Sequence, residues 1–298
     1  AMKNKVLKTI VLSAVWVTAV ILFFTGCSES NKQSYVENDN TTGSASTKIY
    51  KIGIAYFAPE KAVENLMTGL FDGLKARGFE KNKNLEVAFV HCGGELSLLP
   101  SILTELDSRR LDLIIPLSTP CLSAAIKNVK NTPIVFTYVS DPLAAGVGKS
   151  FTEHLANVTG VGSFDPVQES IDLIKRILPN ARTLGAVYNS SEINSVKVID
   201  VARQLCKSNN LELKEISVNS TNEVYQAVEA VITKKIDAFY AISDNTLVQC
   251  FETVAKLCEK HKVPLVSNIS ELTDKGALFS VGFGWYNIGV KSATKVAE

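Results

Sequence analysis

The sequence predicts an α/β protein with two lobes, each built around a parallel sheet. Short β-rich apolar runs alternate with helical patterns, which is typical of parallel βαβ units. This alternation runs from Tyr50 to Phe164 and then starts again at Thr183. At 46% hydrophobic and 20% charged residues the composition is that of a globular protein, so disordered, fibrous and polytopic membrane classes are disfavoured.

The first series holds five expected strands and begins with a clear helix. The strands are expected at Tyr50 to Phe57, Leu85 to Cys92, Leu111 to Ser118, Pro133 to Val139 and Asn157 to Phe164. Between the first two, Val63, Leu66, Leu70 and Leu74 form one apolar stripe at helical spacing, and Gly78 can end that helix.

The second series begins after a polar passage in which Asp165 can cap a helix that starts at Pro166. Its strands are expected at Thr183 to Asn189, Leu211 to Val218, Asp237 to Asp244 and Pro264 to Asn268, with helices at Ile193 to Ser208, Glu223 to Lys235 and Thr246 to His261. A last run at Ala277 to Gly282 precedes a helix that begins at Trp285. That helix is still unfinished at Glu298, so we expect further chain beyond it.

The N-terminus predicts a secretory leader. Three lysines precede an apolar run from Ile10 to Phe24, and Thr25-Gly26-Cys27 follows. A membrane-spanning anchor is the alternative, but fifteen apolar residues fall short of the roughly 20 that a span needs. The end of the run resembles a bacterial lipobox, so residues 1–27 are expected to be a lipoprotein signal with Cys27 acylated. Residues 28–47 are polar and predict a flexible tether.

Several classes of function have little support. The formal charge of +1 provides no field for nucleic acid, and six cysteines and three histidines show no metal-ligand spacing. The Gly146 to Ser150 segment ends like a phosphate loop but has Leu143 where the first glycine belongs, and Gly160-Val161-Gly162 lacks the third glycine of a dinucleotide motif. With no nucleophile, base and orienting group at motif spacing, we expect neither cofactor nor catalysis.

Small polar and aromatic residues concentrate where the expected strands end. In open parallel sheets this edge is where ligands bind, because helix N-termini point into it. The candidate ligand-binding residues are Phe57, Ser118, Thr119, Ser140, Asp141, Phe164, Asn189, Ser190, Glu192, Asp244, Asn245 and Asn268. Each polar member can instead be a helix cap without a ligand. The whole set, contributed by both lobes, favours capture of a polar small molecule.

Four segments carry a resemblance to a known family. They are Val135 to Pro142, Asn157 to Val161, Leu184 to Ser195 and Ser243-Asp244-Asn245, which include Y-N-x-x-E-x-N-S and S-D-N patterns. They resemble the ABC-transporter substrate-binding family that includes tryptophan- and tyrosine-binding lipoproteins. The resemblance implies a type I periplasmic-binding architecture with two Rossmann-like lobes that close on a ligand.

By the same resemblance, lobe one would comprise residues 50–164 plus 269–298 and lobe two residues 165–268. Closure would pivot near residues 164–166 and 268–270. The protein would be a monomer outside the cytoplasm, anchored to the bacterial membrane by its lipid and serving an ABC permease and its ATPase. Its ligand would be an amino acid, aromatic ones included, or a related small molecule, with Asp244 facing an amine or hydroxyl and Thr119 holding a carboxylate.

Three alternatives accompany this interpretation. Within the same fold, the chain could be a ligand-sensing receptor domain that reports to a membrane partner. A repressor would need a DNA-binding helix-turn-helix ahead of the core, and the leader disfavours it. An enzyme would need a catalytic constellation that the sequence does not show. The sequence also departs from amino-acid-binding members between Tyr56 and Lys61, where such proteins carry a Gln and a His-Pro-x-Leu-Asp segment.

Overall fold

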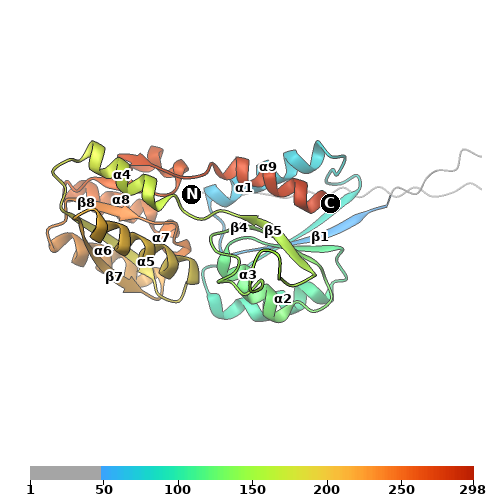
Figure 1. Ribbon diagram of the computed structural model, residues 1–298. Helices are drawn as coiled ribbons and strands as arrows, with labels where there is room; N and C mark the ends of the chain where they lie inside the picture. The colour runs from blue at the N-terminus through green and yellow to red at the C-terminus, as the bar shows by residue number, and fades with distance from the viewer. Residues whose placement is uncertain (1–47) are drawn as a thin grey trace, which may run out of the picture. The chain divides into compact units, whose positions relative to one another are not determined.

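The computed structural model describes residues 48–298 and confirms the α/β fold with two parallel sheets (Figure 1). The leader, Cys27 and the tether lie outside the described residues. Within 48–298, no helix combines the length and the apolar character that crossing a membrane requires.

The first lobe is built on a sheet with the strand order β2-β1-β3-β4-β5. Its strands are β1 (Tyr50–Tyr56), β2 (Leu85–His91), β3 (Leu113–Pro116), β4 (Ile134–Val139) and β5 (Val158–Gly162). All neighbours pair in parallel, so that Ile54 at the centre lies beside Phe89 of β2 and Ile115 of β3. The carboxyl ends of the strands therefore meet at one edge of the sheet.

Helices cover both faces of this sheet. They are α1 (Lys61–Lys75), η1 (Leu96–Leu98), α2 (Leu99–Ser108), α3 (Thr119–Asn128) and α9 (Trp285–Ala297). Because side chains alternate along a strand, Ile52 and Ile54 pack with α1 and α9, whereas Ala55 packs with α2 and α3. The expected stripe on α1, from Val63 to Leu74, is confirmed as buried.

Helix α9 returns from the far end of the described chain to lie directly against α1. A Cβ atom added to Gly69 of α1 would stand 2.0 Å from the carbonyl oxygen of Tyr286, and one added to Gly289 would stand 2.1 Å from that of Leu66. The two backbones therefore touch where only glycine leaves room, which fixes α9 to the first lobe.

The second lobe is built on a sheet with the strand order β10-β9-β8-β6-β7. Its strands are β6 (Thr183–Asn189), β7 (Glu212–Val218), β8 (Ala238–Ala241), β9 (Leu265–Ser267) and β10 (Phe279–Ser280), all paired in parallel. Its helices are α4 (Val167–Ile177), α5 (Ile193–Ser208), α6 (Thr221–Thr233), α7 (Asn245–Gln249), α8 (Phe251–Lys260) and η2 (Ser270–Lys275). Side chains of α4 and α5 pack on one face, and those of α6 and α8 pack on the other.

Two local expectations in this lobe were wrong. The single helix expected from Thr246 to His261 is divided into α7 and α8, because Cys250 leaves helical geometry at φ −102° and ψ 9°. The side chain of Asp165 does not cap α4, since its Oδ2 accepts a hydrogen bond from the backbone N–H of Ser243 at 3.2 Å instead.

The chain crosses between the lobes at residues 163–166 and 281–284. The second crossing differs from the expected boundary at 269, because β10 pairs with β9 and therefore extends the second sheet. Residues 268–270 accordingly connect β9 to η2 within the second lobe. After Gly284 the chain continues as α9, which packs against α1, β4 and β5 of the first lobe.

Candidate functional site

The candidate residues follow the carboxyl ends of the parallel strands in both sheets. Phe57 follows β1, Ser118 and Thr119 follow β3, and Ser140 and Asp141 follow β4. In the second lobe Asn189 is the last residue of β6, and Ser190 and Glu192 follow it. Asp244 and Asn245 follow β8, and Asn268 follows β9. The topology thus places the set at one edge of each sheet, as parallel pairing requires.

In the first lobe, two strand ends are linked through Thr119. Its buried hydroxyl oxygen accepts a hydrogen bond from the backbone N–H of Ser140 at 3.2 Å, joining the ends of β3 and β4. Ser118 adopts φ +83°, a left-handed conformation that is unusual for a residue with a Cβ. Asp141 faces its own turn, where Oδ1 accepts from the N–H groups of Leu143 and Ala144. Asp141 therefore acts as a turn cap.

In the second lobe, Asp244 is fully buried and caps α7. Its Oδ1 accepts from the N–H of Leu247 at 2.7 Å, and its Oδ2 accepts from the N–H of Asn189 at 2.6 Å. Burial raises the pKa of Asp244, and the N–H of Asn189 and other donors oppose that rise. Both carboxylate oxygens are thus occupied by backbone donors, which is the capping role.

Glu192 is also fully buried and joins the end of β6 to the start of α7. Its Oε2 accepts from the backbone N–H of Asn245 at 3.0 Å and from Nδ2 of the same residue. Its Oε1 accepts from the N–H and the hydroxyl of Thr246 at 3.0 and 2.8 Å. Burial, with a smaller contribution from Asp244, raises the pKa of Glu192 to about 7.

The remaining candidates are not joined to these networks. Asn268 donates through Nδ2 to the hydroxyl of Ser170 at 2.9 Å, and the exposed Ser190 donates to Asn219 at 3.1 Å. Phe164 is half-buried and packs against the apolar core of the second lobe. Phe57 is buried among apolar residues of the first lobe.

Several residues at the facing ends were not among the candidates. The Tyr138 and Trp285 rings stack with centroids 3.9 Å apart, and Tyr138 has φ +56°. The N–H of Trp285 donates to Oε1 of Glu271 at 2.6 Å, which links α9 of the first lobe to η2 of the second. Neither contact has a signal in sequence spacing, because 147 positions separate Tyr138 from Trp285 and 14 positions separate Glu271 from Trp285.

Asp165 lies in the first crossing and is almost fully buried. Burial raises the pKa of this carboxyl to about 7, whereas the Ser243 side chain and backbone donors lower it. Glu60, at the start of α1, is a second carboxyl whose pKa burial raises, to about 8.

Some buried polar atoms at the facing strand ends lack a hydrogen-bond partner. They are Oε2 of Glu60, Oγ of Ser118, Oγ of Ser163, Oδ1 of Asn194 and Oδ1 of Asn268. Such groups are rare in folded proteins and call for an explanation. A polar ligand bound between the lobes would supply one.

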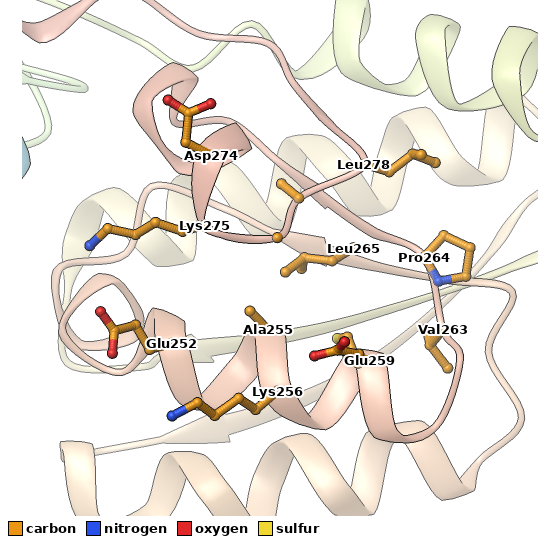
Figure 2. Close-up of a pocket in the computed structure, with 13 residues that line it drawn as sticks. Glu252, Ala255, Lys256, Glu259, Val263, Pro264, Leu265, Asp274, Lys275 and Leu278 are labelled. Carbon is orange, nitrogen blue, oxygen red and sulfur yellow. The ribbon is translucent and has the colours of Figure 1, made fainter.

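Two pockets lie near the candidate residues, and a larger groove lies away from them. Ser140 and Phe164 line a pocket of about 440 Å³ in the first lobe. Glu60 lines another of about 390 Å³, to which both lobes contribute. The groove in Figure 2, about 710 Å³, lies between α8 and the segment from Asp274 to Leu278. No candidate residue lines that groove, so it is not the candidate site.

Comparison with known proteins adds a family match over almost the whole described chain. A family model described as "ABC transporter substrate binding protein" matches residues 51–298. A curated relative from Clostridioides difficile (strain R20291), named tyrosine-binding protein, is 28% identical over 99% of this chain and 84% of its own length.

Two solved structures are similar along the same region. One is a domain from Streptococcus pneumoniae in complex with L-Trp, 28% identical, with a TM-score of 0.79 and coverage of 84% of each chain. The other is the ligand-free, open form of a substrate-binding protein with adhesive properties from Clostridium difficile. It is 31% identical, with a TM-score of 0.60, and the match covers 83% of this chain and 84% of that one.

Proposed function

Because the chain belongs to the ABC transporter substrate-binding protein family, we propose that it captures an aromatic amino acid, tyrosine or tryptophan, between its two lobes. Proteins of this family bind a substrate rather than convert it, so the chain is not an enzyme. The observation that carries the ligand class is the pair of similar proteins whose names specify tyrosine and L-Trp.

The facing strand ends provide chemistry suited to such a ligand. An amino acid carries donors and acceptors that can satisfy the unpartnered oxygens of Ser163, Asn194 and Asn268. The half-buried ring of Tyr138, which is backed by the buried Trp285 ring, can provide aromatic surface at the same end of the first lobe. This combination of apolar surface with a few polar groups is typical of small-molecule sites.

We further propose that the lobes close around the ligand. The two crossings, at 163–166 and 281–284, are short, and short connections between two lobes support a hinge. The TM-score is higher with the L-Trp complex than with the ligand-free open structure, although the sequence identities are similar. This difference favours two arrangements of the lobes within the family, one of which accompanies the ligand.

The bound amino acid would then pass to an ABC permease driven by its ATPase. Substrate-binding proteins work outside the cytoplasm, and acylation of Cys27 would hold a monomeric binder at the membrane through its tether. Changing Cys27 to Ser should leave the chain unacylated and remove it from the membrane fraction. Retention of that variant in membranes, with the same mobility as the wild type, would contradict the lipid anchor.

A thermal-shift panel tests the ligand class. The protein is heated with individual amino acids, nucleosides, sugars and small organic acids. A ligand present at 100 times its Kd adds about 2.7 kcal/mol to the stability of the folded state. We expect tyrosine or tryptophan to raise the melting temperature most. A shift with sugars or nucleosides and none with aromatic amino acids would overturn the proposal.

A further inference from the structure

Glu60 is a carboxyl group at the start of α1, and its buried Oε2 has no hydrogen-bond partner within the described residues. It occupies the N-cap position of α1 in an extended conformation, yet its side chain makes no capping bond. Its Oε2 is buried and has no partner within the described chain. A buried acceptor in this state is satisfied only when a donor reaches it.

Residues from both lobes line the cavity beside Glu60. Residues 59–62 come from the first lobe, and residues 248–253 and 271–275 come from the second. Its volume of about 390 Å³ lies within the range of small-molecule pockets. A ligand there would contact both lobes at once, as closure requires.

Both acidic and basic side chains surround this cavity. Glu271 and the exposed Lys275 face it from η2, the exposed Glu252 from α8, and Lys61 from α1 itself. Burial raises the pKa of Glu60 to about 8; Lys275 opposes the rise and Glu192, across the lobes, adds to it. The hydroxyl of Tyr138 is also near enough for the Glu60 charge to raise its pKa.

We propose that Glu60 binds the ammonium group of the ligand and so restricts the protein to ligands that carry one. This inference rests on the proposed capture of an aromatic amino acid. An ammonium supplies both a donor for Oε2 and a positive charge that stabilises the carboxylate. Each carboxylate oxygen of Asp244 already accepts from a backbone N–H, whereas Oε2 of Glu60 has no donor within the described residues.

A competing explanation is an ion pair between Glu60 and Lys275 that holds the lobes together. The two residues lie on different lobes and their charges attract, but they form no salt bridge within the described residues. In that case Glu60 would assist closure around any ligand. The two explanations differ in whether the effect depends on the ligand's ammonium.

Calorimetric titration of wild type and Glu60→Gln with two ligands distinguishes the ammonium contact from the ion pair. One ligand is L-tyrosine, and the other is desaminotyrosine, which keeps the phenol and the carboxylate but lacks the ammonium. We expect wild type to bind L-tyrosine about tenfold or more tightly than desaminotyrosine, and Glu60→Gln to reduce that ratio to about threefold or less. Lys275→Gln tests the ion pair, and Glu259→Gln, at an exposed position of α8 outside this cavity, is the matched control that should retain the wild-type ratio.

A second measurement follows the release of a proton from Glu60 when the ligand binds. At pH 7 a Glu60 carboxyl with its raised pKa holds a proton that the ligand's ammonium would displace. Titrations in phosphate and Tris buffers, which differ in ionisation enthalpy, should show proton release for wild type and less for Glu60→Gln. Asp165 and Glu192 titrate in the same range and are unchanged in the variant, so the difference reports Glu60.

Three results would contradict the role of Glu60, and they differ in what they imply for the proposed function. An unchanged ligand ratio in Glu60→Gln, with the fold intact by melting temperature, overturns the inference and leaves the proposed function standing. Equal losses for both ligands in Glu60→Gln and Lys275→Gln also overturn it, in favour of the ion pair. A wild-type protein that binds neither tyrosine nor tryptophan overturns the proposed function and the inference with it.

Discussion

The backbone N–H of Asn189 donates to Oδ2 of Asp244 at 2.6 Å, which ties the carboxyl end of β6 to the residue that begins α7. The other oxygen of Asp244 accepts from Leu247 within α7. A motif residue at the facing end of the second lobe therefore organises the site through the backbone. Its expected contact with a ligand amine stays a prediction, beside the proposed role of Glu60, whose Oε2 has no partner within the described residues.

Changing Asp244 to Asn should reduce stability more than affinity. Asparagine has one carboxamide oxygen, so its amide group would face one of the two backbone donors and leave a buried N–H unpaired, at a cost of about 1–3 kcal/mol. Urea denaturation measures this loss. Asp141→Asn is the control, because Oδ1 of Asp141 alone accepts both of its backbone donors and asparagine can replace it. A tenfold affinity loss in Asp244→Asn at unchanged stability would instead place Asp244 on the ligand.

The sequence predicted the parts of this fold that depend on local periodicity. The α1 stripe from Val63 to Leu74 and the restart of strands at Thr183 need only hydrophobic spacing, and both are present. Parallel pairing alone also brings the strand ends to one edge of each sheet, as the sequence predicted.

The partners of the site residues could not be predicted in this way. Glu192 bonds to residues 53 and 54 positions away, and nothing in local sequence distinguishes that carboxylate from one facing a ligand. The positive φ of Tyr138 and the return of β10 to the second sheet likewise depend on tertiary contacts. The sequence did not indicate Glu60 as a site residue. What distinguishes this residue is a buried oxygen without a hydrogen-bond partner, which only the folded structure reveals.

Stability of the ligand-free protein should fall as the pH rises from about 5 to 7. Burial raises the folded-state pKa of Asp165 and of Glu192 to about 7 and that of Glu60 to about 8, so these groups hold protons in the folded state that they release in the unfolded state. The stability that these groups contribute is therefore fully present at a pH below their unfolded-state pKa. It is lost as the pH rises through their folded-state pKa. Each fully shifted group contributes a slope of about 1.4 kcal/mol per pH unit.

Asp165→Asn tests that assignment by urea denaturation at several pH values. The asparagine oxygen can still accept from the N–H of Ser243, so the fold should persist while the slope flattens by about one proton. A slope identical to that of wild type would show that Asp165 is not one of the titrating groups.

Gly282→Ala should destabilise the second crossing. A Cβ atom there would stand 2.1 Å from the carbonyl oxygen of Asn268, a backbone atom that cannot move without shifting β9. We expect a loss of about 1–3 kcal/mol in the free energy of unfolding. Gly284→Ala is the matched control, since its nearest neighbour is the flexible amide of Asn287 at 3.3 Å. Equal stability of the two variants would contradict the close approach at Gly282.

Closure of the lobes should be visible by small-angle X-ray scattering. Both crossings are short, so a ligand that contacts both lobes should favour the compact arrangement. We expect the radius of gyration to decrease when tyrosine saturates the protein. An unchanged radius, with binding confirmed on the same sample by calorimetry, would contradict the hinge.

The most direct test of capture of an aromatic amino acid is calorimetric titration of the purified protein with L-tyrosine and L-tryptophan, with L-leucine and D-glucose as comparison ligands. We predict that one of the aromatic amino acids binds at one site per chain with a Kd in the micromolar range or below, which corresponds to about −8 kcal/mol or more favourable. Leucine and glucose should bind at least about tenfold more weakly. Saturable binding of leucine or glucose with none of tyrosine or tryptophan would contradict the account.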